Sequence, residues 1–192
     1  MARRYYTSAE LRRMGFAKVG ENVRIERSCV IVNPAHISIG HDVIIDQFTF
    51  LIGGQAGVRI GSWIHIAGHN LLGGNAGLEI ADFCNIAAGS KLITASDNFG
   101  GDYLIGPAAP PEHVDIKTEK IVLEENTILG VGTVVLPGCR CAEGTATGAN
   151  TVIVKSTEPY GIYVGSPAQR IKDRGTRCRD RAAQVREAYA AD

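Results

Sequence analysis

Aliphatic side chains recur at every sixth position along most of this chain, usually followed by Gly, Ala, Asp or Glu and then by a small residue. The first positions of these hexads are Val19, Ile25, Ile31, Ile39, Ile45, Leu51, Ile60, Ile66, Leu72, Ile80, Ile86, Leu92, Leu123, Leu129, Val135, Cys141, Thr147 and Ile153. All but Cys141 and Thr147 are Ile, Leu or Val. In a protein of average composition, only roughly a quarter of positions would carry one of these three residues. A fixed short period predicts a solenoid, and a six-residue period predicts a parallel β-helix.

Three hexads make one triangular coil, and successive coils stack at the strand spacing of about 4.8 Å. The first three steps between coil starts are longer than three hexads, so each early coil carries a small bulge. The last full step, from Leu123 to Cys141, carries none. We therefore expect an all-β solenoid over residues 19–164.

Short helical segments are predicted at both ends of this solenoid. Residues 1–18 contain the capping box Thr7-x-x-Glu10 ahead of Leu11, which predicts an N-terminal capping helix. Residues 165–192 are expected to form a loop and then a second helix, from about Arg177 to Ala190, with a mostly solvated basic face. A chain of this length has enough residues for one well-cored domain.

The hexads are interrupted once, between Asn98 and Lys120, in a stretch rich in Gly and Pro. A loop of this length within a compact repeat is usually functional, so residues 98–120 are predicted to be an active-site loop. A disordered insertion is the alternative. The aromatic residues Phe99 and Tyr103 favour an ordered loop.

Charge and cysteine content narrow the choice of partners and compartment. Twenty basic and twenty acidic residues give no overall field that would attract nucleic acid or an anionic membrane. Residues 1–6 are partly basic but no apolar segment follows, so we expect neither a signal peptide nor membrane insertion. Four cysteines fall on small or core positions of the hexads, Cys29, Cys84, Cys139 and Cys141. They are expected to fill the core of a cytoplasmic protein rather than form disulfides.

Over essentially its whole length the chain resembles the hexapeptide-repeat acyltransferases, in its hexads, its break after the fourth coil and its closing Tyr163–Ala168 segment. That resemblance implies a left-handed β-helix, an exception to the rule that connections between parallel strands are right-handed. It also implies a homotrimer with acyl-CoA bound between subunits. Within this superfamily the chain is similar to N-acyltransferases that act on nucleotide-linked amino sugars. The residues that carry this similarity are Tyr6-Thr7, Glu10-Leu11, Met14–Phe16, Ile37–Gly40, Ile45-Asp46 and Ala95–Gly101.

Asp97 is the main candidate for a catalytic role. In related O-acetyltransferases, the position after a segment like Leu92-Ile93-Thr94 resembles the site of a catalytic His. A hydroxyl needs a base with a pKa near 7 when it attacks a thioester, whereas a sugar amine with a pKa of about 7.7–8.0 is already partly neutral. A carboxylate can orient that amine and stabilise the developing ammonium, so Asp97 predicts an amine acceptor. The alternative is a turn residue that caps the break.

The resemblance also implies roles for residues around the cofactor and the sugar. The backbone N–H of Val131 is expected to face the thioester carbonyl as an oxyanion donor. The remaining expected contacts are Ala149, Lys155, Gly165, Arg170 and Lys172 for CoA, and Asn98 and Tyr103 for the sugar. The family often has Thr before the first lysine, where this chain has Val154, and Arg170 could substitute. Packing alone could explain Val131 and Ala149, and simple exposure could explain both lysines.

Two alternative functions, O-acetyl transfer and metal binding, would require histidine side chains. His69 is the reserve base for an O-acetyltransferase of a polysaccharide sugar. A zinc site like that of the γ-class carbonic anhydrases needs three converging imidazoles, and His65 and His69 leave different faces of their coil because they are four apart. We therefore expect no metal. A non-catalytic trimeric scaffold is a further alternative, but the retained Lys155 and Lys172 argue against it.

The sequence therefore predicts an acyl-CoA-dependent N-acyltransferase. Its co-substrate would be acetyl-CoA, and its acceptor the amine of a nucleotide-linked, dTDP-type amino-deoxysugar used in surface polysaccharide biosynthesis. The amine would attack the thioester directly, because no cysteine is suitably placed to act as a nucleophile.

Overall fold

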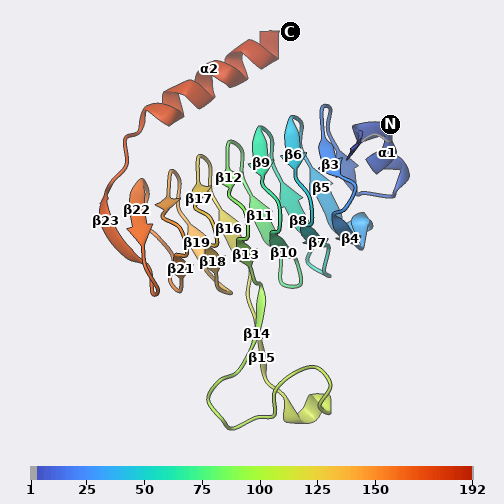
Figure 1. Ribbon diagram of the computed structural model, residues 1–192, viewed down its shortest axis with the longest axis vertical. Coiled ribbons are helices and arrows are strands. Elements are labelled where there is room, and N and C mark those ends of the chain that lie inside the picture. The colour runs from blue at the N-terminus through green and yellow to red at the C-terminus, as the bar shows by residue number, and fades with distance from the viewer. Residues whose placement is uncertain (1–3, 192) are drawn as a thin grey trace.

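Three sheets form the sides of a triangular prism in the computed structural model, which describes residues 4–191 (Figure 1). Residues 1–3, part of the segment expected not to be a signal peptide, and Asp192 lie outside the described residues. Each full coil adds one strand to each sheet, and neighbouring coils pair in parallel. The predicted parallel β-helix is therefore confirmed.

The nine-stranded sheet has the order β1 (Tyr5–Tyr6), β3 (Arg24–Glu26), β6 (Val43–Ile45), β9 (Ile64–Ile66), β12 (Asn85–Ile86), β17 (Ile128–Leu129), β20 (Ala146–Thr147), β22 (Gly161–Val164) and β23 (Gln169–Asp173). The β2–β19 sheet contains β2 (Lys18–Val19), β5 (Ile37–Ile39), β8 (Val58–Ile60), β11 (Leu78–Ile80), β16 (Ile121–Leu123) and β19 (Arg140–Cys141). The β4–β21 sheet contains β4 (Val30–Val32), β7 (Phe50–Ile52), β10 (Leu71–Gly73), β13 (Lys91–Leu92), β18 (Val134–Val135) and β21 (Val152–Ile153). A short 3-10 helix, η1 (Pro34–His36), precedes β5.

The first positions of the hexads form three buried stacks inside the prism. In the β2–β19 sheet, Val19 pairs with Ile39, then Ile60, Ile80, Leu123 and Cys141 in register. All of the first positions are buried except Ile31, which is half-buried against the core. Because each coil places an aliphatic side chain above the previous one, the six-residue pattern alone sets the register of the solenoid.

The cysteines fill space in this core, as predicted. Cys84, Cys139 and Cys141 are buried, Cys29 packs against the core, and all five cysteines are free thiols. Burial raises the pKa of the Cys84 thiol to about 12 and also raises the pKa of Cys141. These thiols therefore stay protonated and are unsuited to act as nucleophiles.

The predicted N-terminal helix is α1 (Ser8–Arg13), which covers the open end of the first coil. Thr7 Oγ1 accepts the Glu10 N–H at 3.3 Å, and Glu10 Oε2 accepts the Thr7 N–H at 2.8 Å. The hydrogen bond from the Thr7 N–H and a second from Arg27 lower the pKa of Glu10 to about 2. The capping box is confirmed, whereas strand β1, antiparallel to β3, was not expected from the sequence.

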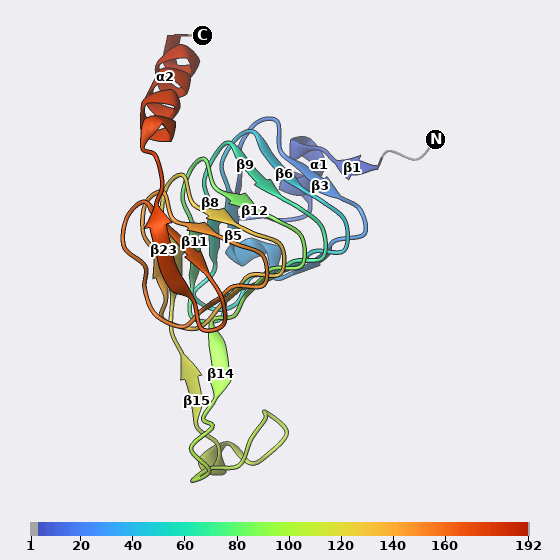
Figure 2. The ribbon, with the colours of Figure 1, turned by 60° about the vertical axis from the view of Figure 1, so that its left-hand side comes forward.

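The predicted C-terminal helix is α2 (Arg177–Ala191), which lies along one edge of the prism (Figures 1 and 2). We call this the helix edge, the row of turns that contains Asp42, Trp63, Phe83, Asn126 and Gly144. Arg179 pairs with Glu143 at 2.7 Å and Tyr189 stacks on His41 with ring centroids 4.2 Å apart. Neither helix in the described part of the chain is long and apolar enough to span a bilayer.

Arg186 joins α2 to three residues of the coils, Asp82, Phe83 and Glu125. Its Nη2 lies 3.0 Å from Asp82 Oδ2 and 2.5 Å from Glu125 Oε1, and its guanidinium lies 5.0 Å above the Phe83 ring. We expect Arg186→Ala to weaken helix docking by about 1 kcal/mol, since solvent screens part of each ion pair, and so to speed amide exchange in α2 by about fivefold. Arg181→Ala is the control, because among the described residues Arg181 bonds only Gln184, which lies in the same helix. Equal exchange in both variants would contradict this role.

The break in the hexads forms an arm that projects from the prism (Figures 1 and 2). Strands β14 (Ala95–Asp97) and β15 (Ile116–Thr118) pair antiparallel at its base, and the outer part contains the 3-10 helix η2 (Pro111–His113). Below the arm, β11 pairs directly with β16 in parallel register. The solenoid is therefore continuous across the insertion. We call the row of turns from which the arm leaves the loop edge.

Candidate active site

Five turns stack along a second edge of the prism, which we call the Val131 edge. Each is tied to the next by one backbone hydrogen bond: His69 N to Gln47 O (2.9 Å), Gly89 N to Gly68 O (3.1 Å), Gly132 N to Ala88 O (2.9 Å) and Asn150 N to Val131 O (2.7 Å). This edge brings together three predicted site residues, His69, Val131 and Ala149. Gly165 extends it past the last coil, because its carbonyl accepts the Val152 N–H at 2.9 Å.

Buried threonines fix the backbone on either side of Val131. Thr147 Oγ1 accepts the Gly130 N–H at 2.9 Å, and Thr133 Oγ1 donates to the Gly130 carbonyl at 2.7 Å. Only glycine fits at position 130, since a Cβ there would lie 2.6 Å from the Thr147 carbonyl. No residue in the range 4–191 accepts a hydrogen bond from the Val131 N–H, and the Val131 side chain is 55% exposed. The turn therefore presents a rigid, free donor, as an oxyanion site requires.

Asp97 lies at the base of the arm, at the end of β14 and on the loop edge. Its Oδ1 accepts the Gly106 N–H at 2.8 Å, so this oxygen helps to fold the arm, which is the structural role weighed for it above. Within the described residues its Oδ2 has no hydrogen-bond partner, and the side chain is half-buried. One carboxylate oxygen thus remains able to contact a ligand.

The two predicted sugar contacts differ in their freedom. Asn98 is held within the arm, because its Nδ2 donates to Asp115 Oδ2 at 2.6 Å and its Oδ1 accepts the Gly100 N–H at 2.7 Å. Tyr103 is 48% exposed, farther out on the arm. Asn98 is therefore preorganised, whereas Tyr103 is open to solvent.

The predicted CoA contacts occupy two regions. Arg170 and Lys172 lie on β23, beyond the last coil, and both are exposed. Arg170 Nη2 lies 2.8 Å from Asp173 Oδ1, and this hydrogen bond raises the pKa of the arginine. Lys155 is also exposed but follows β21 on the loop edge. A single chain therefore places Lys155 on a different edge from Ala149 and Gly165.

The other histidines have structural partners. His65 Nε2 lies 2.8 Å from Asp46 Oδ2, so this histidine has a structural hydrogen-bond partner. His36 Nδ1 lies 2.8 Å from the Gly54 carbonyl, His41 contacts Asp42, and His113 belongs to η2. Residues 4–191 contain no group of three or more His, Cys, Asp or Glu side chains placed to hold a metal ion.

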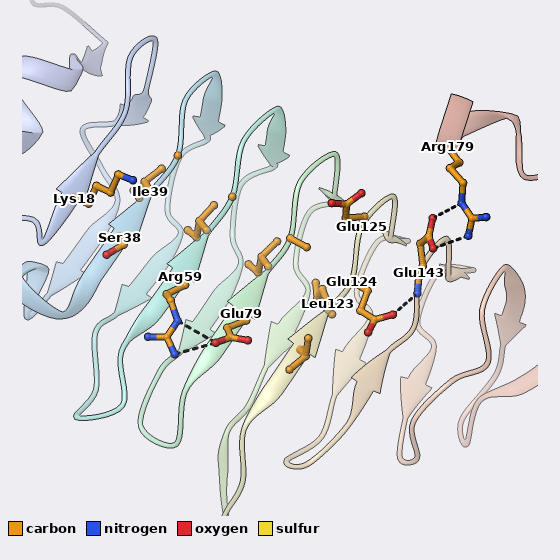
Figure 3. Close-up of a pocket in the computed structure, with 16 residues that line it drawn as sticks. Lys18, Ser38, Ile39, Arg59, Glu79, Leu123, Glu124, Glu125, Glu143 and Arg179 are labelled. Atoms are coloured by element: carbon orange, nitrogen blue, oxygen red, sulfur yellow. Dashed lines mark hydrogen bonds and ion pairs between the residues drawn. The ribbon is translucent and has the colours of Figure 1, made fainter. Parts of the chain in front are cut away.

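A groove with a volume of about 940 Å³ lies between the β2–β19 sheet and α2 (Figure 3). Four of its charged side chains form two ion pairs within the groove, Arg59–Glu79 at 2.9 Å and Arg179–Glu143 at 2.7 Å. None of the predicted site residues lines it. We therefore place the candidate site on the Val131 edge and not in this groove.

A smaller pocket beside His69 was missed by the sequence analysis. It has a volume of about 680 Å³ and is lined by Phe48, Phe50, His69, Asn70, Leu71 and Lys91. The sequence does carry a signal for it, because Phe48 and His69 stand at turn positions where the later coils of this edge have Gly89, Gly132 and Asn150.

No family model matches this chain. It is 32% identical over 170 residues to the dTDP-4-amino-4,6-dideoxy-D-glucose acyltransferase of Escherichia coli, and the match covers 88% of each chain. The chain belongs to the hexapeptide-repeat acyltransferase family.

Solved structures of this acyltransferase family agree with the geometry. AntD, an N-acyltransferase from Bacillus cereus in complex with dTDP and 3-hydroxybutyryl-CoA, is 36% identical with a TM-score of 0.92, over 97% of this chain and 98% of AntD. A variant of AntD in complex with dTDP-4-amino-4,6-dideoxyglucose and coenzyme A is 37% identical with a TM-score of 0.91, over 96% of this chain and 98% of AntD. The hexapeptide-repeat fold therefore extends over nearly the whole chain, and the predicted left-handed β-helix is confirmed.

Proposed function

We propose that this enzyme transfers an acetyl group from acetyl-CoA to the amine of a dTDP-linked amino-deoxysugar. The observation that carries the proposal is the similarity, over most of both chains, to acyltransferases named for such a sugar or solved with it. Two features of the site support it: the free Val131 N–H and the open oxygen of Asp97. Acetyl-CoA and the five free thiols fit a reducing cytoplasm as its place of action.

The proposed reaction is a direct attack within a ternary complex. The neutral amine forms the new bond to the thioester carbonyl carbon, and the Val131 N–H stabilises the oxyanion. The carboxylate of Asp97 orients the amine and stabilises the positive charge that develops on it. The C–S bond then breaks, and the proton lost by nitrogen passes to the departing CoA sulfur. No covalent intermediate on the protein is required, because the amine is itself the nucleophile.

A homotrimer would complete this site. In one chain Asp97 is on the loop edge and Val131 on the Val131 edge, at opposite ends of the β4–β21 sheet strands. Asp97 follows the fourth coil and Val131 lies in the fifth, so the two levels differ by one coil, about 5 Å. Copies packed side by side with parallel axes would bring the arm of one to the Val131 edge of the next. A closed three-fold ring would repeat this contact without leaving an open surface.

The two substrates would approach Val131 from opposite ends of its edge. Ala149 and Gly165 leave room for the pantetheine arm on the C-terminal side. Arg170 and Lys172 lie beyond them and would meet the CoA phosphates. Lys155 would reach the same CoA only from another copy, since it lies on the loop edge. Asn98 and Tyr103 would contact the sugar from the arm.

Release of CoA thiol tests the proposed function. With acetyl-CoA we expect turnover of a dTDP-linked 3-amino or 4-amino dideoxysugar and none of the matched sugar with a hydroxyl at that carbon. The reason is that the site offers a carboxylate that suits an amine rather than a base with a pKa near 7. Turnover of the hydroxyl sugar alone would overturn the proposal. It would favour O-acetylation with His69 as base, since that side chain is exposed on the same edge.

A further inference from the structure

The Val131 edge differs from the other two edges in the side chains that fill its interior corner. Two residues before each first hexad position, the helix and loop edges carry mostly aliphatic residues, such as Val43, Ile64 and Val58. On the Val131 edge this position is polar from the second coil onward and at most 1% exposed, as Thr49, Asn70, Ser90, Thr133 and Thr151. A buried polar group is costly unless it is hydrogen-bonded, so the partners of this row show what it does.

Four of these side chains donate a hydrogen bond to the carbonyl three residues earlier in the chain. The pairs are Asn70 with Ala67 (2.6 Å), Ser90 with Ala87 (3.1 Å), Thr133 with Gly130 (2.7 Å) and Thr151 with Gly148 (2.9 Å). A trans peptide places its C=O and its N–H on opposite sides. Because these four carbonyls face the core, the N–H group after each of them faces outward. The Val131 N–H therefore takes its direction from Thr133.

The backbone ladder is irregular at the Val131 turn. In the coil before it, the Ala87 N–H donates to the main-chain carbonyl of Leu129 in the next coil, at 2.9 Å. The equivalent N–H, that of Gly130, donates instead to the side-chain hydroxyl of Thr147, also at 2.9 Å. This exchange requires a hydroxyl at a first hexad position, where nearly all other residues are aliphatic.

The two threonines close a ring of hydrogen bonds around Gly130. Thr133 uses its only proton on the Gly130 carbonyl at 2.7 Å rather than on the Gly148 carbonyl at 3.5 Å. Thr147 Oγ1 lies 2.8 Å from Thr133 Oγ1 and is therefore the donor between them. Hydrogen bonds in such a chain polarise one another. Because the ring draws electron density from the Gly130 carbonyl, the Val131 N–H of the same peptide group becomes a stronger donor.

We propose that Thr133 and Thr147 are positioning residues for acyl transfer, which aim the Val131 N–H at the thioester oxyanion and strengthen it as a donor. The inference rests on the proposed function, because it assigns both residues a role in that reaction. Both hydroxyls lie inside the prism, with Thr133 fully buried and Thr147 8% exposed. They act through the peptide group between Gly130 and Val131 and touch no substrate. A second copy packed on this edge therefore leaves their action unchanged.

Replacing Thr133 with Val exchanges the hydroxyl for a methyl group of similar size and opens the ring. We expect kcat for acetyl transfer to fall about 10-fold, less than the cost of about 10²- to 10³-fold for losing an oxyanion donor altogether. KM for both substrates should change by less than about twofold, because the donor stabilises the oxyanion more than the ground-state carbonyl. Thr133→Ser keeps the hydroxyl and should recover most of kcat.

Thr145→Val is the matched control for the loss of a buried hydroxyl. Thr145 is equally buried, and its Oγ1 lies 2.6 Å from Thr157 Oγ1, which accepts the Ala142 N–H at 3.0 Å. This second hydroxyl pair has the same form but follows Gly144 on the helix edge. The control should lower Tm about as much as Thr133→Val does and should keep wild-type kcat.

Thr147→Val is a second test that does not depend on the stability of the first. It installs the aliphatic type of residue that nearly all other first hexad positions carry, so the fold is retained. It also removes the acceptor of the Gly130 N–H and should lower kcat about as much as Thr133→Val. Wild-type kcat in both valine variants would overturn the inference.

A double variant separates positioning from a general loss of packing. In Val131→Pro the donor is gone, so adding Thr133→Val should lower kcat no further. If the added change again costs about 10-fold, the two residues act independently and the inference is wrong.

The nitrogen resonance of the Val131 amide gives a measurement that needs no turnover. It can be followed in protein with ¹⁵N-labelled valine and is identified by its loss in Val131→Ala. It should shift in Thr133→Val and Thr147→Val but not in Thr145→Val, because hydrogen bonding at a carbonyl polarises the amide of the same peptide group. An unshifted resonance in the first two variants contradicts the inference. If the resonance shifts but no amino sugar is acetylated, the positioning stands and only the proposed function fails.

Discussion

Replacing Asp97 with Asn is expected to lower kcat for acetyl transfer to a dTDP-amino sugar by at least about 10²-fold. The amide keeps the shape of the side chain and can still accept the Gly106 N–H, so the arm stays folded. What it loses is the negative charge that orients the amine and stabilises the developing ammonium. Steady-state release of CoA thiol at saturating substrates measures this effect.

Asp102→Asn is the matched control for this experiment. Asp102 is an exposed carboxylate on the same arm, so it tests whether any loss of charge there impairs the enzyme. We expect it to retain wild-type kcat. If Asp97→Asn is equally active, or if both variants lose activity alike, Asp97 serves only to fold the arm.

Replacing Val131 with Pro should lower kcat by about 10²- to 10³-fold, the typical cost of losing one oxyanion donor. Proline removes the N–H, which has no acceptor among the described residues, so the fold loses no hydrogen bond. Val131→Ala keeps the N–H and should remain close to wild type. Single-turnover measurements, together with unchanged circular dichroism, would assign the loss to the chemical step. If the Pro and Ala variants behave alike, the donor role is wrong.

The two impaired variants together test whether the site lies between copies. Co-expressed Asp97→Asn and Val131→Pro chains with different tags can be purified as mixed trimers by selecting for both tags. If the arm of one copy serves the edge of the next, about one third of the sites in each mixed trimer contain no altered residue and recover activity. If each site lies within one chain, no activity returns.

The hexads predicted the architecture because each coil repeats one simple requirement. A side chain such as Leu72 must fill the prism interior, and the next coil must place Leu92 beside it, so period and register follow from the pattern. The exceptions were informative too. Thr147 stands where an aliphatic residue is expected because its hydroxyl accepts the Gly130 N–H and so fixes the turn at Val131.

The candidate site was less predictable because it depends on which edges meet. The sequence predicted roles for Asp97, His69, Val131 and Ala149. The six-residue period alone, however, does not show which turns lie on the same edge of the prism. Bulges and the arm shift the count, and only backbone pairing shows His69 and Val131 on one edge. The Phe48 pocket was missed for a related reason. Phe48 and His69 lie outside the hydrophobic period of the hexads, so that period gives no indication of their conformation. Their positive φ angles are apparent only in the structure.

The direct pairing of β11 with β16 has a consequence for how this enzyme can change over time. Because β11 pairs directly with β16 beneath the arm, the arm is an insertion, and the stacking of the coils does not depend on it. Its length and sequence can drift, or be exchanged with those of another family member, while the stacked core keeps its register. New acceptors can therefore arise by editing one peripheral segment, on a framework whose stability does not depend on the outcome.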